Sequence, residues 1–173
     1  METKEVPSPG MDRGKMEKSV SMQPTKILIL ATLAGGYAGA DATGQSHAEY
    51  PANTFILPVM CPCIFPPEFY LHAFERGIDG ILVLYSGTDS PYQVEADGTA
   101  KLIQGAYELI KGRGIDTRRL RLAAICTVCV KPFMKEVNQM HELLKGIGRV
   151  QDEIIAFTAE DAQVAQVEKE PRP

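Results

Sequence analysis

The sequence lacks tryptophan, has only three histidines and four cysteines, and carries no excess of positive charge. Its formal net charge is −4. Nucleic acids are bound mainly through lysine and arginine, so the sequence offers no electrostatic basis for a nucleic acid partner. No apolar run approaches the ~20 residues that a membrane-spanning helix needs. We therefore expect no nucleic acid partner and no membrane span.

The long apolar run near the N-terminus, residues 27–34, begins too late and is too short for a secretory signal. We therefore expect a cytoplasmic protein. The cytoplasm keeps thiols reduced, which argues against a framework of disulfides. Hydrophobic residues make up 45% and charged residues 23% of the 173 residues, which is typical of one globular domain.

Three regions differ in composition. Residues 1–25 hold proline, glycine, serine and mixed charge without an apolar period, which predicts a flexible leader. Residues 26–148 hold the apolar runs of a folded domain. Residues 149–173 form an acidic tail, in which residues 151–173 hold six acidic and two basic residues with a net charge of −4. This tail has room for one helix, over residues 154–167.

Alternating apolar runs and amphipathic segments predict the fold. Four continuous apolar runs are typical of strands buried on both faces: 27–31, 54–60, 80–85 and 120–125. Segments with helical periodicity or terminal glycines predict helices between them: 37–48, 67–76, 97–111 and 133–145. Pro58 lacks an amide donor, which favours an edge strand or a bulge. We predict an α/β fold with a small open parallel sheet of about four strands flanked by helices, in a flavodoxin-like or Rossmann-like arrangement.

Two cysteine pairs follow predicted strands, where sites form in sheets of this kind. Cys61 and Cys63 follow the second run, and Cys126 and Cys129 follow the fourth. Two close-spaced pairs can supply four thiolates to zinc or an iron–sulfur cluster, so we predict that these four residues bind one metal centre. The two loops must lean together, because other strands at ~4.8 Å spacing separate them. The alternatives are a redox-active or partner-facing pair, and the packing of buried cysteine.

Other segments carry weaker signals. Ala31–Gly36 has two glycines before a helix, but dinucleotide binding also needs a third glycine and an acid about 20 residues further on. A tight turn is the favoured interpretation. Ser86–Tyr92 is polar but holds no nucleophile elbow. His47, His72 and His141 fall in predicted helices without a partner carboxylate and nucleophile, so we assign no catalytic residue.

Several short motifs occur in an order that resembles a known family. They are Tyr37–Asp41, Val59–Cys61, Pro67–Phe69, Ala73–Leu84 and Arg119–Leu122. Over residues 26–148 the chain resembles the iron–sulfur delta subunit of methyl-viologen-reducing nickel–iron hydrogenase. That family links hydrogenase or formate dehydrogenase modules to heterodisulfide reductase complexes. The resemblance implies a non-catalytic electron-transfer or adaptor subunit of an oxidoreductase complex in an anaerobe's cytoplasm. Its implied partners are a heterodisulfide reductase-like iron–sulfur flavoprotein subunit, or hydrogenase or formate dehydrogenase subunits.

The resemblance also implies a 2Fe-2S cluster, but the cluster cysteines are missing. The family's Cys-Cys-x-x-Cys run corresponds to residues 31–35, and its turn after the third strand corresponds to Ser86–Ser90; neither holds a cysteine here. Only Cys61 falls where the family has one. We expect no cluster at the family's position. Two explanations remain for the missing cysteines. Either the four cysteines present bind a relocated cluster or zinc, or the domain is a cluster-free docking module. A third alternative is a thiol-based regulatory protein that uses its last two cysteines.

Overall fold

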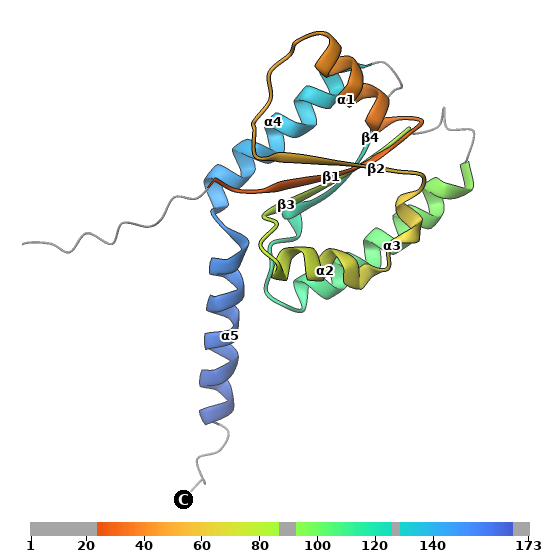
Figure 1. Ribbon diagram of the computed structural model, residues 1–173. Coiled ribbons are helices and arrows are strands. Elements are labelled where there is room, and N and C mark those ends of the chain that lie inside the picture. The colour runs from red at the N-terminus through yellow and green to blue at the C-terminus, as the bar shows by residue number, and fades with distance from the viewer. Residues whose placement is uncertain (1–23, 87–92, 126–128, 168–173) are drawn as a thin grey trace, which may run out of the picture.

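A computed structural model of the protein describes residues 24–86, 93–125 and 129–167. Four strands form one parallel sheet in the order β2-β1-β3-β4 (Figure 1). The strands are β1 (Ile27–Thr32), β2 (Thr54–Val59), β3 (Gly80–Tyr85) and β4 (Leu120–Ala124). The α-helices are α1 (Gly36–Gln45), α2 (Pro67–Glu75), α3 (Gln93–Lys111), α4 (Val130–Ile147) and α5 (Val150–Val167). This arrangement confirms the predicted α/β fold.

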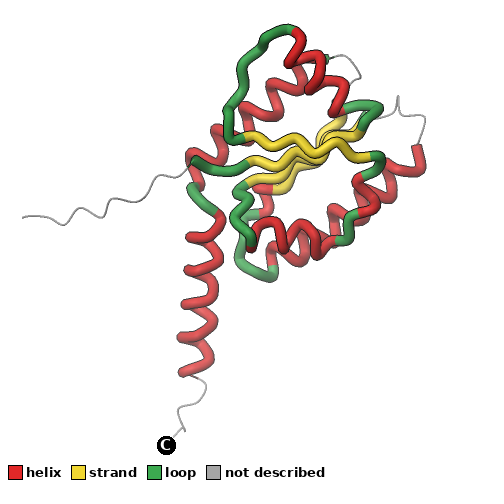
Figure 2. The backbone as a smooth tube through the Cα atoms, in the orientation of Figure 1, coloured by secondary structure: helices red, strands yellow, loops and turns green. Residues whose placement is uncertain are grey.

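The sheet lies between two layers of helices (Figure 2). One face packs against α1 and α4, and the other packs against α2 and α3. Leu28 and Leu30 of β1 face the α2–α3 layer, whereas Ile27 and Ile29 face the α1–α4 layer. The central strands β1 and β3 are therefore covered on both sides, which is why their sequences are apolar without alternation.

The edge strand β2 carries Pro58 with its nitrogen toward solvent. The carbonyl groups of Asn53 and Val59 accept the N–H groups of Ile27 and Leu33. The backbone groups of odd-numbered residues in this strand thus point to β1, and those of even-numbered residues point outward. Proline therefore removes no hydrogen bond from the ladder, and the predicted edge position is confirmed.

The helix α4 is longer than its apolar pattern predicted. It begins at Val130 rather than Phe133, because Pro132 lies in the first turn, where an amide has no acceptor within the helix. It ends before Gly148, whose φ of +74° suits glycine, and not at Gly146. The predicted apolar stripe is fully buried and consists of Phe133, Val137, Met140 and Leu144.

A buried arginine joins the sheet to the last helix. Arg119 directly precedes β4, and each of its five N–H donors has an acceptor. Its Nε and Nη2 atoms donate to the Glu153 carboxylate of α5 at 3.1 and 2.7 Å. Its Nη1 atom donates to the carbonyls of Asp79 and Gly148, both at 3.0 Å. The fifth donor reaches the carbonyl of Ile147 at 3.4 Å.

The carboxylate of Asp79 extends this network. Asp79 is fully buried directly before β3, and it accepts the N–H of Lys26 at 2.8 Å and the N–H of Val150 at 2.9 Å. The starts of β1, β3 and β4 are thus tied to the first turn of α5. Two buried charged residues can be accommodated here because their polar groups are paired.

The acidic tail forms a helix that begins four residues earlier than predicted. The first turns of α5 pack on the domain through Val150 and Ile154, and Phe157 lies against Gly114. The remainder of α5 extends away from the sheet (Figure 1). No helix in the described ranges is long and apolar enough to cross a membrane. The predicted leader falls almost entirely outside these ranges, so its flexibility stays a prediction.

Candidate functional site

The described cysteines lie at the carboxyl ends of the two outermost strands. Cys61 follows β2 and caps the short 3-10 helix η1 (Pro62–Ile64), which contains Cys63. Cys129 follows β4 and precedes the first residue of α4. Because β2 and β4 are the two edge strands of the sheet, three inter-strand spacings, or about 14 Å, separate them. Cys126 lies outside the described residues.

Cys61 and Cys63 are joined by a disulfide with a Cα–Cα distance of 5.2 Å. This bond corrects our expectation that the cysteines are not oxidised, and Cys129 is disulfide-bonded as well. Within residues 24–86, 93–125 and 129–167, no three His, Cys, Asp or Glu side chains are grouped to hold a metal ion. The four-cysteine metal site stays a prediction. It requires reduced cysteines and loops from opposite sides of the sheet that meet.

The Cys61–Cys63 disulfide stabilises the fold only weakly. The bond closes a loop of three residues within one turn. The chain-entropy relation gives about 1.6 kcal/mol for such a loop, against about 4.7 kcal/mol for a loop of 100 residues. The bond also links no two separate elements of the sheet or helices. A purely structural role is therefore a poor explanation for this pair.

The two sulfur atoms have different surroundings. Cys61 is only 7% exposed, whereas Cys63 is exposed. The N–H of Cys63 donates to the Cys61 Sγ atom at 3.1 Å. The turn around them is held by backbone hydrogen bonds from Ile64 to the Cys61 carbonyl and from Phe65 to the Pro62 carbonyl. Cys63 is thus the exposed residue of the pair, whereas Cys61 is buried and its sulfur accepts a hydrogen bond.

The positions that correspond to the family's cluster cysteines are closely packed. A Cβ atom on Gly35 would lie 2.6 Å from the backbone Cα and N atoms of Ser86. Ala31 is fully buried in the core beneath α1 and α4, and Thr32 is 4% exposed. An iron–sulfur cluster needs thiolate ligands and space between the loops that carry them. The residues present supply neither, so they do not fit a cluster at this place.

Exposed apolar side chains gather around β2. Of the seven large ones among the described residues, six lie on this strand or beside it: Leu33, Tyr37, Phe55, Leu57, Met60 and Ile64. We call these six residues the β2 surface. Phe55 and Leu57 continue the sheet face that α2 and α3 cover on β1, but they are 51% and 41% exposed. Exposed apolar residues that gather in this way make the β2 surface a candidate docking surface.

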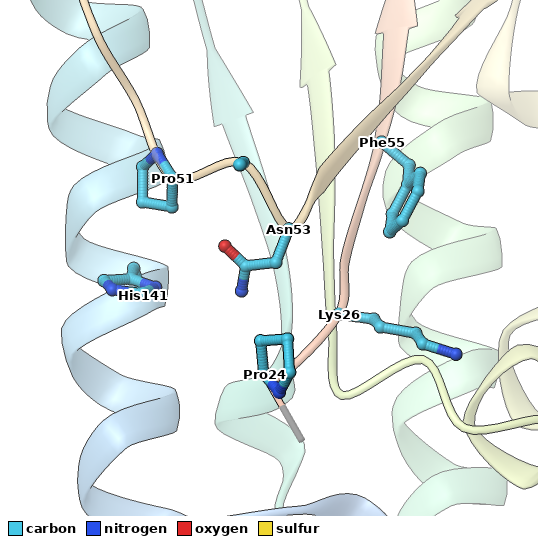
Figure 3. Close-up of a pocket in the computed structure, with 7 residues that line it drawn as sticks. Pro24, Lys26, Pro51, Asn53, Phe55 and His141 are labelled. Atoms are coloured by element: carbon cyan, nitrogen blue, oxygen red, sulfur yellow. The ribbon is translucent and has the colours of Figure 1, made fainter. Parts of the chain in front are cut away.

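A pocket of about 670 Å³ lies at the other end of the sheet (Figure 3). Its lining includes Lys26, Asn53 and Phe55, together with His141 from α4. The side-chain amide of Asn53 donates to the carbonyl of Thr25. The pocket contains no carboxylate among its described lining residues and lies at the amino ends of the strands, opposite the edge where α/β sheets bind ligands. We assign it no function.

The three histidines lie at separate places in the fold. His47 lies beyond the end of α1 and not within a helix as predicted, with a φ of 54°. His72 lies on α2 and its exposed ring contacts the Glu75 carboxylate at 3.0 Å. His141 lies on α4, in the pocket described above. The three histidines thus belong to separate segments of the described structure.

These features define a flavodoxin-like α/β domain with a cysteine pair and an apolar surface at one edge strand. Residues 27–148 match the model of the family described as methyl-viologen-reducing hydrogenase, delta subunit. This match covers more than half of the chain. The chain belongs to the methyl-viologen-reducing hydrogenase delta subunit family, as its sequence motifs predicted. The match ends before α5 begins.

Relatives come from two kinds of complex. The chain is 34% identical over 118 residues to one subunit of the ferredoxin/F420H2-dependent CoB-CoM heterodisulfide reductase from Methanosarcina acetivorans. It is 24% identical over 123 residues to the iron-sulfur subunit of the F420-non-reducing hydrogenase vhu from Methanocaldococcus jannaschii. These matches cover 68% and 70% of the chain, 15% of the reductase subunit and 92% of the hydrogenase subunit. The chain thus corresponds to one part of the first protein and to nearly all of the second.

Proposed function

We propose that this chain is an adaptor subunit that docks onto an iron–sulfur flavoprotein subunit of a heterodisulfide reductase-like complex. The observation that carries the proposal is the β2 surface, where six exposed apolar side chains surround one edge of the sheet. The similarity to part of a heterodisulfide reductase subunit supports this choice of partner. Hydrogenase subunits are alternative partners, supported by the hydrogenase iron-sulfur relatives. Formate dehydrogenase subunits are a further alternative that rests on the family resemblance alone.

The adaptor works without the family's cluster. The close approach of Gly35 to Ser86 and the buried position of Ala31 leave no thiolate and no room at the family's cluster position. Electron transfer through a cluster in these loops is therefore not part of the proposal. The domain contributes a rigid α/β body that presents the β2 surface.

A binding experiment tests the docking surface. The Phe55→Ser/Leu57→Ser variant should bind the purified flavoprotein of a heterodisulfide reductase-like complex at least tenfold more weakly than the wild type in analytical ultracentrifugation. Ile155→Ser is the matched control, because Ile155 is 66% exposed but lies on α5. Unchanged affinity in the double variant, or an equal loss in the control, would contradict the proposed surface.

An elemental assay tests the missing cluster. Protein purified without oxygen should contain no stoichiometric iron or acid-labile sulfide and should show no cluster absorbance. Stoichiometric iron and sulfide would contradict the cluster-free adaptor. Loss of that iron in a Cys129→Ser variant would then place it at the predicted four-cysteine site, because Cys129, unlike Cys61, does not fall at a cysteine position of the family.

A further inference from the structure

We propose that Cys61 and Cys63 form a redox-active pair that exchanges its disulfide with a dithiol on a partner protein. This activity goes beyond the adaptor function and does not require it. The pair already exists as a disulfide, and its loop of three residues gives the bond little structural value. In a reducing compartment, such as the predicted cytoplasm, disulfides are usually transient and catalytic or sensing.

The difference in burial sets the direction of attack. The Sγ atom of an incoming thiolate can reach the exposed Cys63 but not Cys61, which is 7% exposed. The N–H of Cys63 already donates to the Cys61 Sγ atom at 3.1 Å. A hydrogen bond to sulfur favours its charged thiolate form, so Cys61 is suited to be the leaving group.

The backbone keeps the two residues together after the bond is broken. Pro62 lies between them, and its ring fixes its own φ angle. The hydrogen bonds from the N–H groups of Ile64 and Phe65 close the turn without using either sulfur. The reduced thiols therefore stay close enough to form the disulfide again. Thiol pairs that are held together in this way exchange reversibly.

The surroundings of Cys63 suit a protein partner. Met60 and Ile64 flank the pair and are 68% and 65% exposed. On α3, Gly98 faces Cys63, and even a Cβ atom there would lie 3.9 Å from the Cys63 Cβ atom. The absence of a side chain at Gly98 leaves the approach to Cys63 open, and the apolar neighbours supply a contact area around it.

The exchange balances as two displacement steps. A partner thiolate attacks the Cys63 Sγ atom, the Cys61–Cys63 bond breaks, and a mixed disulfide with Cys63 forms while Cys61 leaves as a thiolate. The second partner thiolate attacks the partner's own sulfur in that mixed disulfide and releases Cys63. The partner dithiol is oxidised to a disulfide, the cysteine pair gains two electrons, and the two protons of the partner pass to the pair.

The equilibrium is measured on the wild-type protein. The full chain is equilibrated with glutathione mixtures, acid-quenched and alkylated, and the oxidation state of each cysteine pair is determined by peptide mass spectrometry. The controlled quantity is the squared concentration of glutathione divided by the concentration of glutathione disulfide. When this quantity changes tenfold, we expect the ratio of dithiol to disulfide at Cys61–Cys63 to change tenfold as well. A pair that stays fully oxidised or fully reduced across all mixtures would overturn the proposal.

Single variants test the order of attack. We expect 5,5′-dithiobis(2-nitrobenzoate) to modify Cys63 in a Cys61→Ser variant at least tenfold faster than Cys61 in a Cys63→Ser variant. Equal rates, or a faster Cys61, would overturn the assigned roles. The Cys61→Ser/Cys63→Ser variant should melt only a few degrees below the oxidised wild type, and a fall of more than about ten degrees would assign the bond a structural role instead. These assays need no partner, so they can fail or succeed independently of the docking experiment.

Discussion

Replacing Arg119 by methionine tests the network that joins the sheet to α5. Methionine keeps a long side chain but removes five donors, so the Glu153 carboxylate and three carbonyl groups lose their partner. Removing one member of a buried ion pair costs about 3–5 kcal/mol. The Glu153 side chain is 23% exposed and also accepts the N–H of Asp116 at 2.9 Å, so water and that bond offset part of the loss. We expect the free energy of unfolding to fall by about 3 kcal/mol.

Urea denaturation followed by circular dichroism measures this loss. The midpoint should fall with an unchanged m value, and the melting temperature should fall by about 6–12 °C for a chain of this length. Arg118→Met is the matched control: it removes the same charge one residue away, where the guanidinium is exposed and pairs with Asp116. This control should lower the midpoint far less than Arg119→Met does, because exposed ion pairs contribute only about 0–1 kcal/mol.

A double variant separates the ion pair from general damage. Replacing Arg119 and Glu153 together by methionine removes both charges, so no carboxylate is left without its partner. The double variant should be more stable than Arg119→Met alone. The reasoning would be refuted if the double variant lost the sum of the two single effects, or if Arg119→Met lost less than about 1 kcal/mol.

Further predictions concern four single residues: Gly35, Gly44, Tyr70 and Asp116. Gly35→Ala should lower the free energy of unfolding by about 1–3 kcal/mol because its Cβ would lie 2.6 Å from opposing backbone atoms. In the same helix region, Gly44→Ala should raise the free energy of unfolding by about 0.5–1 kcal/mol, because nothing lies within 4 Å of the added Cβ atom. Thermal unfolding compares the Gly35 and Gly44 variants. Tyr70→Phe should raise the free energy of unfolding by about 1 kcal/mol, because the hydroxyl is buried without a hydrogen-bond partner in the described structure. Burial raises the pKa of Tyr70 to about 12, so its ultraviolet titration should lag behind the exposed tyrosines. The hydrogen bond from Arg118 holds the pKa of Asp116 below 3.8. The stability that Asp116 adds is therefore present above about pH 4 and lost as the pH falls through the lowered pKa, and urea midpoints of Asp116→Asn and wild type should converge in acid.

The strands could be predicted because burial on both faces leaves a strong signal. The run from Gly80 to Tyr85 is apolar at every position after the glycine, as a central parallel strand requires. Pro58 also predicted an edge strand, because proline lacks the backbone N–H that an inner strand needs for hydrogen bonds on both sides. Helix starts were less accurate. The predicted helix over residues 133–145 began directly after Pro132, although proline is accommodated in a first turn.

The buried network was missed because its members are charged. Asp79 and Arg119 each stand directly before a buried strand. A charge at that place is buried only when it is paired, so the position itself was a usable signal. Glu153 could not have been found in this way, because its partner is 34 residues away and its helix had a thin apolar face.

The arrangement of the cysteines depended on strand order. The chain passes from β2 to β3 on the far side of β1, which leaves β2 and β4 at opposite edges. Sequence shows only the order along the chain, so it put both pairs at the carboxyl end of the sheet without showing how far apart they lie. The disulfide between Cys61 and Cys63 was missed because the expected compartment, and not the local spacing, decided the prediction.

The region that matches the family is shorter than the region that the buried network holds together. The match ends at residue 148, yet Asp79 accepts an N–H from Val150 and Arg119 donates to Glu153. A fragment that stopped at the family boundary would keep both buried charges but would lose the Glu153 carboxylate and the Val150 N–H that pair with them. Such a fragment would also lose the packing of the Phe157 side chain against Gly114. The shortest fragment suited to crystallisation, or to transplantation into another protein, therefore has to include the first two turns of α5.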